Sequence, residues 1–359
     1  MTMIEILRQT LETGEVPFTP GLEQAQGYGP LHLRNLNLDW EVTFDIYLKV
    51  KQPGDTLPRF VRGCSRGEVF QRDWYQKLLD LKIPYVYISL GEMDRVIQYL
   101  HHNLDLALAD PNKTDLEKSL RVYDATNMWT INFFNQEIAR TGDHVKLALR
   151  YLDNFFELIE HDRNIILHLM DIRQHSYRLS AHCLNVCLLG LAFTGYLGWD
   201  QEDIRAFGLA ALLHDIGLTR TPRTILEKQG KLTDEEMVKI KRHPQDGFNM
   251  MQEFVSMRWE GLEMVLQHHE NGDGSGYPKG LKSKAIQPWA KTLRILDSYE
   301  AMTAERPWRP AMAPKDALWI MRTEWEKGKL FDPHFLAAFV RFLAEGDKGE
   351  DAPDPDATS

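Results

Sequence analysis

The stretch FGLAALLHDIG at residues 207–217 sets the fold of the larger part of this chain. Its apolar residues predict a buried helix, and Gly217 is a natural C-terminal breaker. His214 and Asp215 are expected on the last turn, where adjacent side chains point about 100° apart and can contact neighbouring cations. A charged pair buried in an apolar helix is costly unless it is paired or metallated.

Helical periodicity continues on both sides of this stretch. From about residue 115 to 345, apolar residues recur at spacings of three and four, as in LALRYLDNFFELI at 147–159. The charge-free segment 183–199 approaches the length of a membrane span, but Asn185, three glycines and the adjoining DQEDIR favour a buried core helix. Cys183 and Cys187 are expected to pack inside it, so we predict no membrane span.

The first hundred residues are α/β in character. In EVTFDIYLKV at 41–50, every second residue from Val42 to Val50 is apolar, which predicts a strand. A turn is predicted at 52–55, a second strand pair at 59–70, a helix at 73–83 and another strand at 84–90. The C-terminal residues GDKGEDAPDPDATS are acidic and lack apolar anchors, which predicts disorder.

These patterns predict a mainly α protein, with an all-helical domain preceded by a small α/β N-terminal domain and a helical linker. The predicted boundaries are a regulatory or sensory domain at 1–110, the linker at 111–143, the catalytic domain at 144–345 and a disordered tail at 346–359. We also predict a homodimer through residues 115–160, because one stripe cannot bury their many apolar side chains. Those side chains are Trp129, Ile131, Phe133, Phe134, Leu147, Leu149, Leu152, Phe155, Phe156 and Ile159.

Composition limits the possible partners. The 359 residues carry a net charge of −10, which argues against general DNA or RNA binding. Three cysteines are too few for a disulfide framework, and the N-terminus lacks the basic start and apolar run of a secretory signal. We therefore expect a cytoplasmic protein.

Histidines and carboxylates recur across the helical part in a pattern that suits metal binding. Donors of these two kinds, without cysteine, fit Fe, Mn or Zn. Asp171 and His175 are four residues apart and would share a helix face. The candidate ligands are Asp171, His175, His214, Asp215, His243, His268, His269 and Asp297. Three other histidines are interpreted as hydrogen-bonded helix residues, namely His161, His168 and His182.

A glycine-rich loop follows two of these candidates. In EMVLQHHENG, His268 and His269 are expected at the end of an apolar helix. The glycines after them permit a sharp turn and close approach to a ligand.

Six ordered blocks over residues 144–340 resemble the HD-GYP branch of the HD superfamily of metal-dependent phosphohydrolases. The blocks are HSYRL (175–179), LLHDIG (212–217), ILEKQGKLTDEE (225–236), HPQDG (243–247), HHENGDGSGYPKGL (268–281) and ILDSYEAMTAERPWRP (295–310). The resemblance implies two or three divalent ions, commonly iron or manganese, and hydrolysis of cyclic di-GMP to pGpG or GMP. It assigns the seven candidates other than Asp171 as ligands, with Asp171 at the position of a glutamate that accompanies a third metal.

The resemblance also assigns residues to the substrate. Gly276, Tyr277 and Pro278 would form the signature loop beside it, and Arg306 and Arg309 would lie near its phosphate or guanine. Tyr277 could instead pack the loop. In the expected mechanism, a hydroxide held between two metals attacks phosphorus, and Asp215 bridges the metals. Phosphate charge could be offset by Arg306, Arg309, Lys228 or Lys231, although a solvated helix face is the alternative for each.

One departure from the family pattern leaves the function open. Leu218 stands where the family has a lysine that handles the substrate phosphate. Two alternatives to a cyclic di-GMP phosphodiesterase therefore remain. One is a hydrolase of cyclic GMP–AMP. The other is a cyclic dinucleotide receptor with weak or no turnover that signals to a protein partner through the N-terminal domain.

Overall fold

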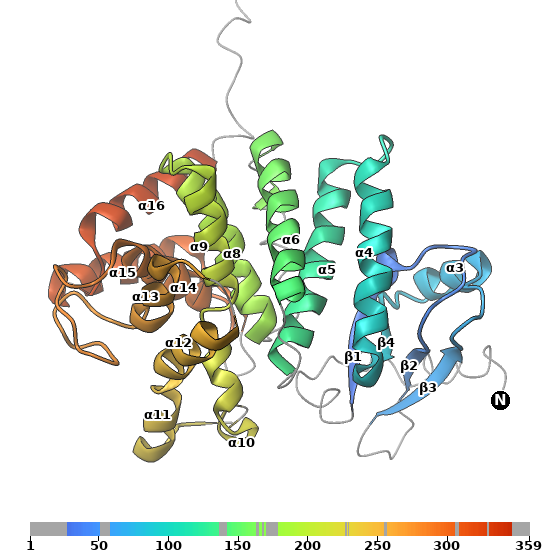
Figure 1. Cartoon of the computed structure of the whole chain (residues 1–359), viewed down its shortest axis with the longest axis horizontal. Helices are drawn as coiled ribbons and strands as arrows, with labels where there is room; N and C mark the ends of the chain where they lie inside the picture. Colours follow the sequence, from blue (N-terminus) through green and yellow to red (C-terminus); the bar gives the residue numbers. More distant parts are fainter. Residues whose placement is uncertain are drawn as a thin grey trace, which may run out of the picture. The chain divides into compact units, whose positions relative to one another are not determined.

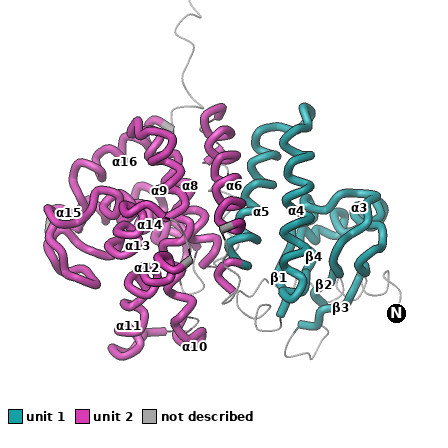
Figure 2. Tube along the Cα trace, viewed as in Figure 1, with its two compact units in different colours: residues 1–132 teal, residues 133–359 magenta. Residues whose placement is uncertain are grey.

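The computed structural model describes residues 27–50, 58–135, 142–162, 165–166, 169, 179–226, 228, 230–254, 257–305, 309–328 and 330–346. The chain divides into two compact units, Met1–Asn132 and Phe133–Ser359 (Figure 2). The predicted boundaries at 110 and 143 stay predictions, whereas packing places residues 111–132 with the first unit. The predicted turn at 52–55 and most of the predicted tail lie outside the described residues.

The first unit contains a small antiparallel sheet. Its strands are β1 (Tyr28–His32), β2 (Ile46–Val50), β3 (Arg59–Cys64) and β4 (Tyr85–Ser89), in the order β1-β4-β2-β3. The predicted alternation at 41–50 is confirmed, because Val42, Phe44, Ile46, Leu48 and Val50 are all buried. The segment 59–70, predicted as a strand pair, holds the single strand β3 and an isolated bridge between Val69 and Glu41.

Three α-helices follow in the described part of this unit, α3 (Arg72–Asp80), α4 (Met93–Ala109) and α5 (Asp115–Asn135), whose last residues pass into the second unit. The Tyr99 ring of α4 packs edge-on against Phe44, with ring centroids 5.3 Å apart. Asp124 of α5 accepts hydrogen bonds from Arg34 Nε and Asn35 Nδ2, both at 2.7 Å. These bonds tie α5 to the segment that follows β1, which explains why most of this helix belongs to the first unit.

The elements of regular secondary structure in the described part of the second unit are helices (Figure 1). The mainly α fold predicted from the sequence is therefore confirmed. The helices are α6 (Gly142–His161), α8 (Leu179–Tyr196), α9 (Gln201–Leu212), η4 (Ile216–Arg220), α10 (Arg223–Leu226), α11 (Asp234–Ile240), α12 (His243–Phe254), α13 (Trp259–Gln267), α14 (Pro288–Thr303), α15 (Pro314–Gly328) and α16 (Pro333–Gly346).

Helix α8 forms the centre of the second unit and packs against α6, α9, α14 and α16. It is long and apolar enough to cross a membrane, but 83% of it is buried inside the protein. A core helix is therefore confirmed, and Cys183 and Cys187 pack within it with no exposed surface. The cytoplasmic location stays a prediction.

The apolar residues that motivated a dimer are mostly covered within the single chain. Seven of the ten are buried, and Leu147, Leu149 and Phe156 are partly exposed. The three partly exposed side chains all lie on α6. The homodimer stays a prediction.

Candidate metal centre

The His214–Asp215 pair lies at a sharp break between two helices. Helix α9 ends at Leu212, so the His214–Asp215 pair follows the helix. The sequence predicts the pair on the last turn of this helix, and that prediction was wrong. The break is held by close backbone packing, since a Cβ on Gly217 would lie 2.0 Å from the His243 carbonyl oxygen. Glycine at this position therefore lets η4 approach the start of α12, which brings Asp215 next to His243.

Three buried imidazoles are oriented in the same way. The Nδ1 atoms of His214, His243 and His268 lie 2.7, 2.8 and 2.7 Å from the backbone carbonyls of the residues three positions earlier. A carbonyl can only accept, so each Nδ1 carries the proton and donates. Each ring then presents its Nε2 toward the centre of the site.

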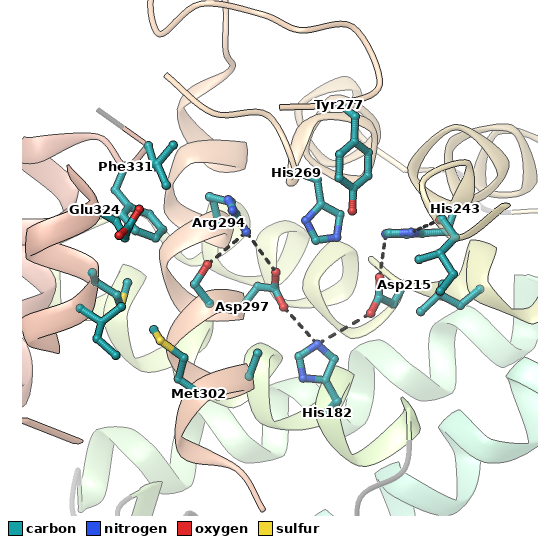
Figure 3. A pocket seen from close by; sticks show the side chains of 17 residues that line it. His182, Asp215, His243, His269, Tyr277, Arg294, Asp297, Met302, Glu324 and Phe331 are labelled. Carbon is teal, nitrogen blue, oxygen red and sulfur yellow. Dashed lines mark hydrogen bonds and ion pairs between the residues drawn. The ribbon is translucent and has the colours of Figure 1, made fainter. Parts of the chain in front are cut away.

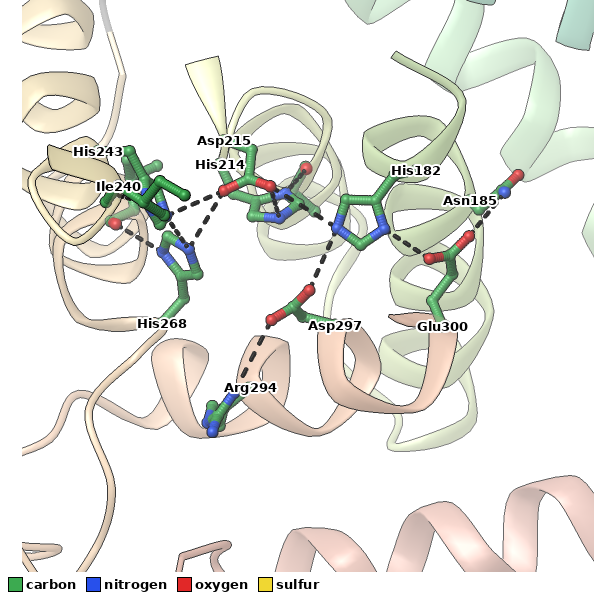
Figure 4. Close-up of polar contacts among 12 residues, drawn as sticks. His182, Asn185, His214, Asp215, Ile240, His243, His268, Arg294, Asp297 and Glu300 are labelled. Atoms are coloured by element: carbon green, nitrogen blue, oxygen red, sulfur yellow. Dashed lines mark hydrogen bonds and ion pairs between the residues drawn. The ribbon is translucent and has the colours of Figure 1, made fainter. Parts of the chain in front are cut away.

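Asp215 lies between two groups of histidines. Its Oδ1 is 3.0 Å from His243 Nε2 and 3.6 Å from His268 Nε2. Its Oδ2 is 3.5 Å from His214 Nε2 and 3.7 Å from His182 Nε2 (Figure 4). One carboxylate therefore faces two half-sites, which is the arrangement that lets it bridge two cations.

The donor atoms fit metal ions better than they fit one another. The Nε2 atoms of His243 and His268 are 3.1 Å apart, and both face Asp215 Oδ1. His214 Nε2 is buried and has no hydrogen-bond partner among the described residues. A buried unpaired nitrogen costs about 1–3 kcal/mol. A bound cation would relieve this penalty. The donor atoms form two groups, and within each group all of them lie within 4.8 Å of one another. One group is Asp215, His243, His268 and His269, and the other is His182, His214 and Asp215.

His182 is a central member of this cluster that the sequence interpretation missed. Its Nε2 is 3.2 Å from Asp297 Oδ1, and its Nδ1 is 2.5 Å from Glu300 Oε2. Asn185 Nδ2 donates to Glu300 Oε1 at 2.9 Å. The signal was present, because an ionisable residue in a charge-free core helix needs a partner.

Burial and charge set the protonation of these side chains. Burial lowers the pKa of His214 to about 4 and holds that of His269 well below its usual value, so both rings are neutral. Burial opposes the charged form of His182, but Glu300 and Asp297 outweigh it and raise its pKa to about 10. Burial opposes ionisation of Asp215, but the surrounding histidines outweigh it, in part through hydrogen bonds from His243 and His268, and hold the pKa of Asp215 well below the usual range.

The signature loop packs back onto the end of α13. A Cβ on Gly276 would lie 2.3 Å from the Asn271 backbone nitrogen, so glycine is required there. The Tyr277 N–H donates to the His269 carbonyl at 3.1 Å, and the Tyr277 ring stacks on the His269 imidazole with centroids 4.8 Å apart. The glycine-rich sequence thus allows close approach of the loop to its own backbone. The loop thereby holds the Tyr277 ring over His269, a candidate metal ligand.

A cavity of about 500 Å³ opens beside the cluster (Figure 3). His182, Asp215, His243, His269 and Asp297 line its ionic end. Residues from α14 and α15 and the segment after α15 line the other end, and these are mainly apolar. Tyr277, Leu218 and Arg294 also line the cavity.

The three predicted basic residues that the structure describes do not line the cavity. Arg309 donates to the carbonyls of Ala301 and Met302, at the end of α14. Lys228 pairs with Glu236 at 2.6 Å, and Lys231 is exposed. Arg306 and the candidate ligands Asp171 and His175 lie outside the described residues. The cluster around Asp215 contains all the predicted ligands that the structure describes, namely His214, Asp215, His243, His268, His269 and Asp297.

Fold and site together define an all-helical domain with a histidine–aspartate cluster whose donors suit metal ions. Residues 169–335, a little under half of the chain, match the family described as HD domain. This segment is therefore an HD domain, and relatives named as cyclic di-GMP phosphodiesterases match part of the chain.

Relatives of known name match the same part of the chain. Cyclic di-GMP phosphodiesterase PA4108 of Pseudomonas aeruginosa is 36% identical over 50% of this chain and 42% of its own length. The cyclic di-GMP phosphodiesterase response regulator RpfG of Xanthomonas campestris is 37% identical over 42% of this chain and 39% of its own. The 3′3′-cGAMP-specific phosphodiesterase 1 of Vibrio cholerae is 36% identical over 47% of this chain and 37% of its own length. The chain thus spans about two fifths of the length of these relatives.

A solved structure shares the fold over most of the chain. Bd1817, an HDG"Y"P protein from Bdellovibrio bacteriovorus, superposes with a TM-score of 0.65 and 20% identity. The match covers 88% of this chain and 99% of that protein. At this identity the likeness shows the fold alone.

Proposed function

We propose that this chain is a metal-dependent phosphodiesterase that hydrolyses cyclic di-GMP to pGpG or GMP. The observation that carries the proposal is Asp215, whose two carboxylate oxygens each face a separate pair of histidine Nε2 atoms. Relatives named as cyclic di-GMP phosphodiesterases match the segment that holds this centre and supply the substrate class.

Two divalent ions are proposed, one in each half-site. The first half-site would consist of His182, His214, Asp297 and one oxygen of Asp215. The second would consist of His243, His268, His269 and the other oxygen of Asp215. Histidine and carboxylate donors without thiolate favour iron or manganese. Ions in these half-sites would supply Lewis-acid activation of the phosphate and of water.

The chain's own residues arrange that chemistry. Asp215 would set the spacing of the two half-sites, because both of its oxygens are committed to them. The backbone carbonyls behind His214, His243 and His268 keep the three Nε2 atoms aimed inward without any proton rearrangement. Tyr277 covers His269 and would limit access of bulk water on that side.

Turnover with separated products tests the proposal. Anaerobically purified protein loaded with Fe(II) or Mn(II) is expected to convert cyclic di-GMP to pGpG or GMP. His268→Ala, which removes a ligand from the second half-site, is the inactive control. Absence of both products with either metal would overturn the proposal. Parallel rates on cyclic GMP–AMP measure base preference, since one relative is named for that substrate.

A receptor role is the second candidate, and Leu218 favours it. Leu218 lines the cavity and offers no charge to a phosphate. In this case the protein would bind cyclic di-GMP tightly and release no product over hours. Leu218→Lys would then raise the rate, because it restores a cation beside the centre.

A further inference from the structure

We infer that Arg294 binds the substrate phosphate in this chain and takes over the role left vacant at Leu218. The inference rests on the proposed function and concerns the same site. A cyclic dinucleotide carries two phosphodiesters, each with one negative charge. The cavity that would receive it is lined by Asp215, Asp297 and Glu324, so charge balance needs a cation besides the metals.

Arg294 is the one Arg or Lys side chain among the described residues that line the cavity. The other basic candidates are committed elsewhere or exposed. Arg309 is bonded to backbone carbonyls, Lys228 is paired with Glu236, and Lys231 faces solvent. Among the described arginine and lysine side chains, Arg294 is therefore the one placed in the cavity wall to meet substrate charge.

The guanidinium group is held in place before any ligand arrives. Its Nη2 donates to Asn271 Oδ1 at 3.2 Å, and its Nη1 donates to Ser298 Oγ at 3.1 Å. Its Cζ lies 5.7 Å from the centroid of the Phe331 ring. An arginine fixed by three neighbours loses little conformational entropy when it binds an anion. Asn271 belongs to the signature-loop block, so the loop itself helps to orient this arginine.

The group also has unused binding capacity. Its Nε is buried without a hydrogen-bond partner among the described residues. Nη1 forms a long ion pair with Asp297 Oδ2 at 4.0 Å, which is beyond hydrogen-bond range. A planar guanidinium with a free N–H suits phosphate oxygens, to which it can donate two parallel hydrogen bonds.

The position of Arg294 matches the direction in which a substrate would extend. Arg294 lies between Asp297 at the ionic end and Phe331 and Glu324 at the other end (Figure 3). A scissile phosphate at the metal ions would therefore leave the rest of the dinucleotide within reach of this arginine. The residue comes from helix α14, one turn before Asp297, so the same helix positions a candidate ligand and the cation.

A second-site rescue tests the inference. Affinity would be measured by calorimetry with a phosphorothioate analogue of cyclic di-GMP, and kcat and KM with cyclic di-GMP itself. We expect Arg294→Gln to weaken analogue binding about ten- to hundredfold, with unchanged metal content. Leu218→Lys added to Arg294→Gln should restore much of the affinity, because it returns a cation to the cavity. Lys291→Gln is the matched control, since Lys291 lies on the same helix and pairs with Asp332.

The outcomes separate this inference from the proposed function. Equal analogue affinity in wild type and Arg294→Gln would overturn the inference while leaving turnover intact. A weakened Arg294→Gln variant that Leu218→Lys cannot improve would also overturn it, because the arginine would then act only by shaping the cavity. Binding that depends on Arg294 in a protein without turnover would support the inference and refute the phosphodiesterase. A wild-type protein that binds no analogue would overturn both.

Discussion

Replacement of Gly217 by alanine tests whether close backbone packing builds the metal centre. The added Cβ would lie 2.0 Å from the His243 carbonyl oxygen and 2.6 Å from the Gly247 nitrogen. Neither atom can rotate away, because both belong to the backbone of α12. Overpacking of this kind costs about 1–3 kcal/mol, and a backbone clash places Gly217→Ala in the upper part of that range.

The expected loss is therefore about 2–3 kcal/mol, which lowers the melting temperature of a unit this size by roughly 4–12 °C. To relieve the clash, η4 must move away from α12, which separates Asp215 from His243. Metal content should fall together with stability. Both would be measured on the purified variant, by thermal denaturation followed by circular dichroism and by elemental analysis.

Gly195→Ala provides the matched control. Gly195 lies in α8, and a Cβ there would meet nothing within 4 Å. Alanine should stabilise the helix by up to about 1 kcal/mol and leave metal content unchanged. If Gly217→Ala melts and binds metal like the wild type, close packing between η4 and α12 does not position the centre, and the reasoning fails.

Three further predictions follow from the contacts of the described residues. His268→Ala and His269→Ala should each lose metal and activity while helical content persists, whereas Asn271→Ala should keep its metal; full occupancy in both histidine variants would end their assignment as ligands. Glu300→Gln should weaken metal binding about ten- to hundredfold, since it replaces the carboxylate that holds His182 Nδ1, and an unchanged metal titration would show that the contact is dispensable. In the first unit, burial lowers the pKa of His32 to about 4. The unfolded chain protonates this ring below its usual pKa of 6.5 and the folded chain does not, so stability is retained above pH 6.5 and falls as the pH drops toward 4. The wild type should lose up to about 2 kcal/mol more than His32→Asn over that range, and parallel pH profiles of urea denaturation would contradict this.

Much of the fold could be predicted because local patterns agree with the tertiary structure. Alternation at 41–50 marks β2 and the residues before it, and the uncharged segment 183–199 marks the core helix. Helix α4 and strand β1 were missed. Both have mixed apolar and polar residues that become informative only through their partners, as when Tyr99 of α4 packs on Phe44.

The candidate site was predicted where short motifs place donors next to one another. His214, Asp215, His268 and His269 were found in this way, with His243 and Asp297 from the ordered blocks. His182 and Arg294 were not found, because their roles depend on contacts between distant segments. Glu300 is more than a hundred residues from His182, and Asn271 is 23 residues from Arg294. Neither contact can be predicted from a local sequence pattern, because its two residues are far apart in the chain.

Elemental analysis of anaerobically purified protein, paired with turnover of the same sample, tests the central claim most directly. The arrangement of two half-sites around Asp215 predicts two divalent ions per chain and conversion of cyclic di-GMP to pGpG or GMP. Asp215→Asn should retain the helical fold and lose both the metal and the activity. A protein that hydrolyses cyclic di-GMP with no bound metal, or an Asp215→Asn variant that keeps two ions per chain, would contradict the account.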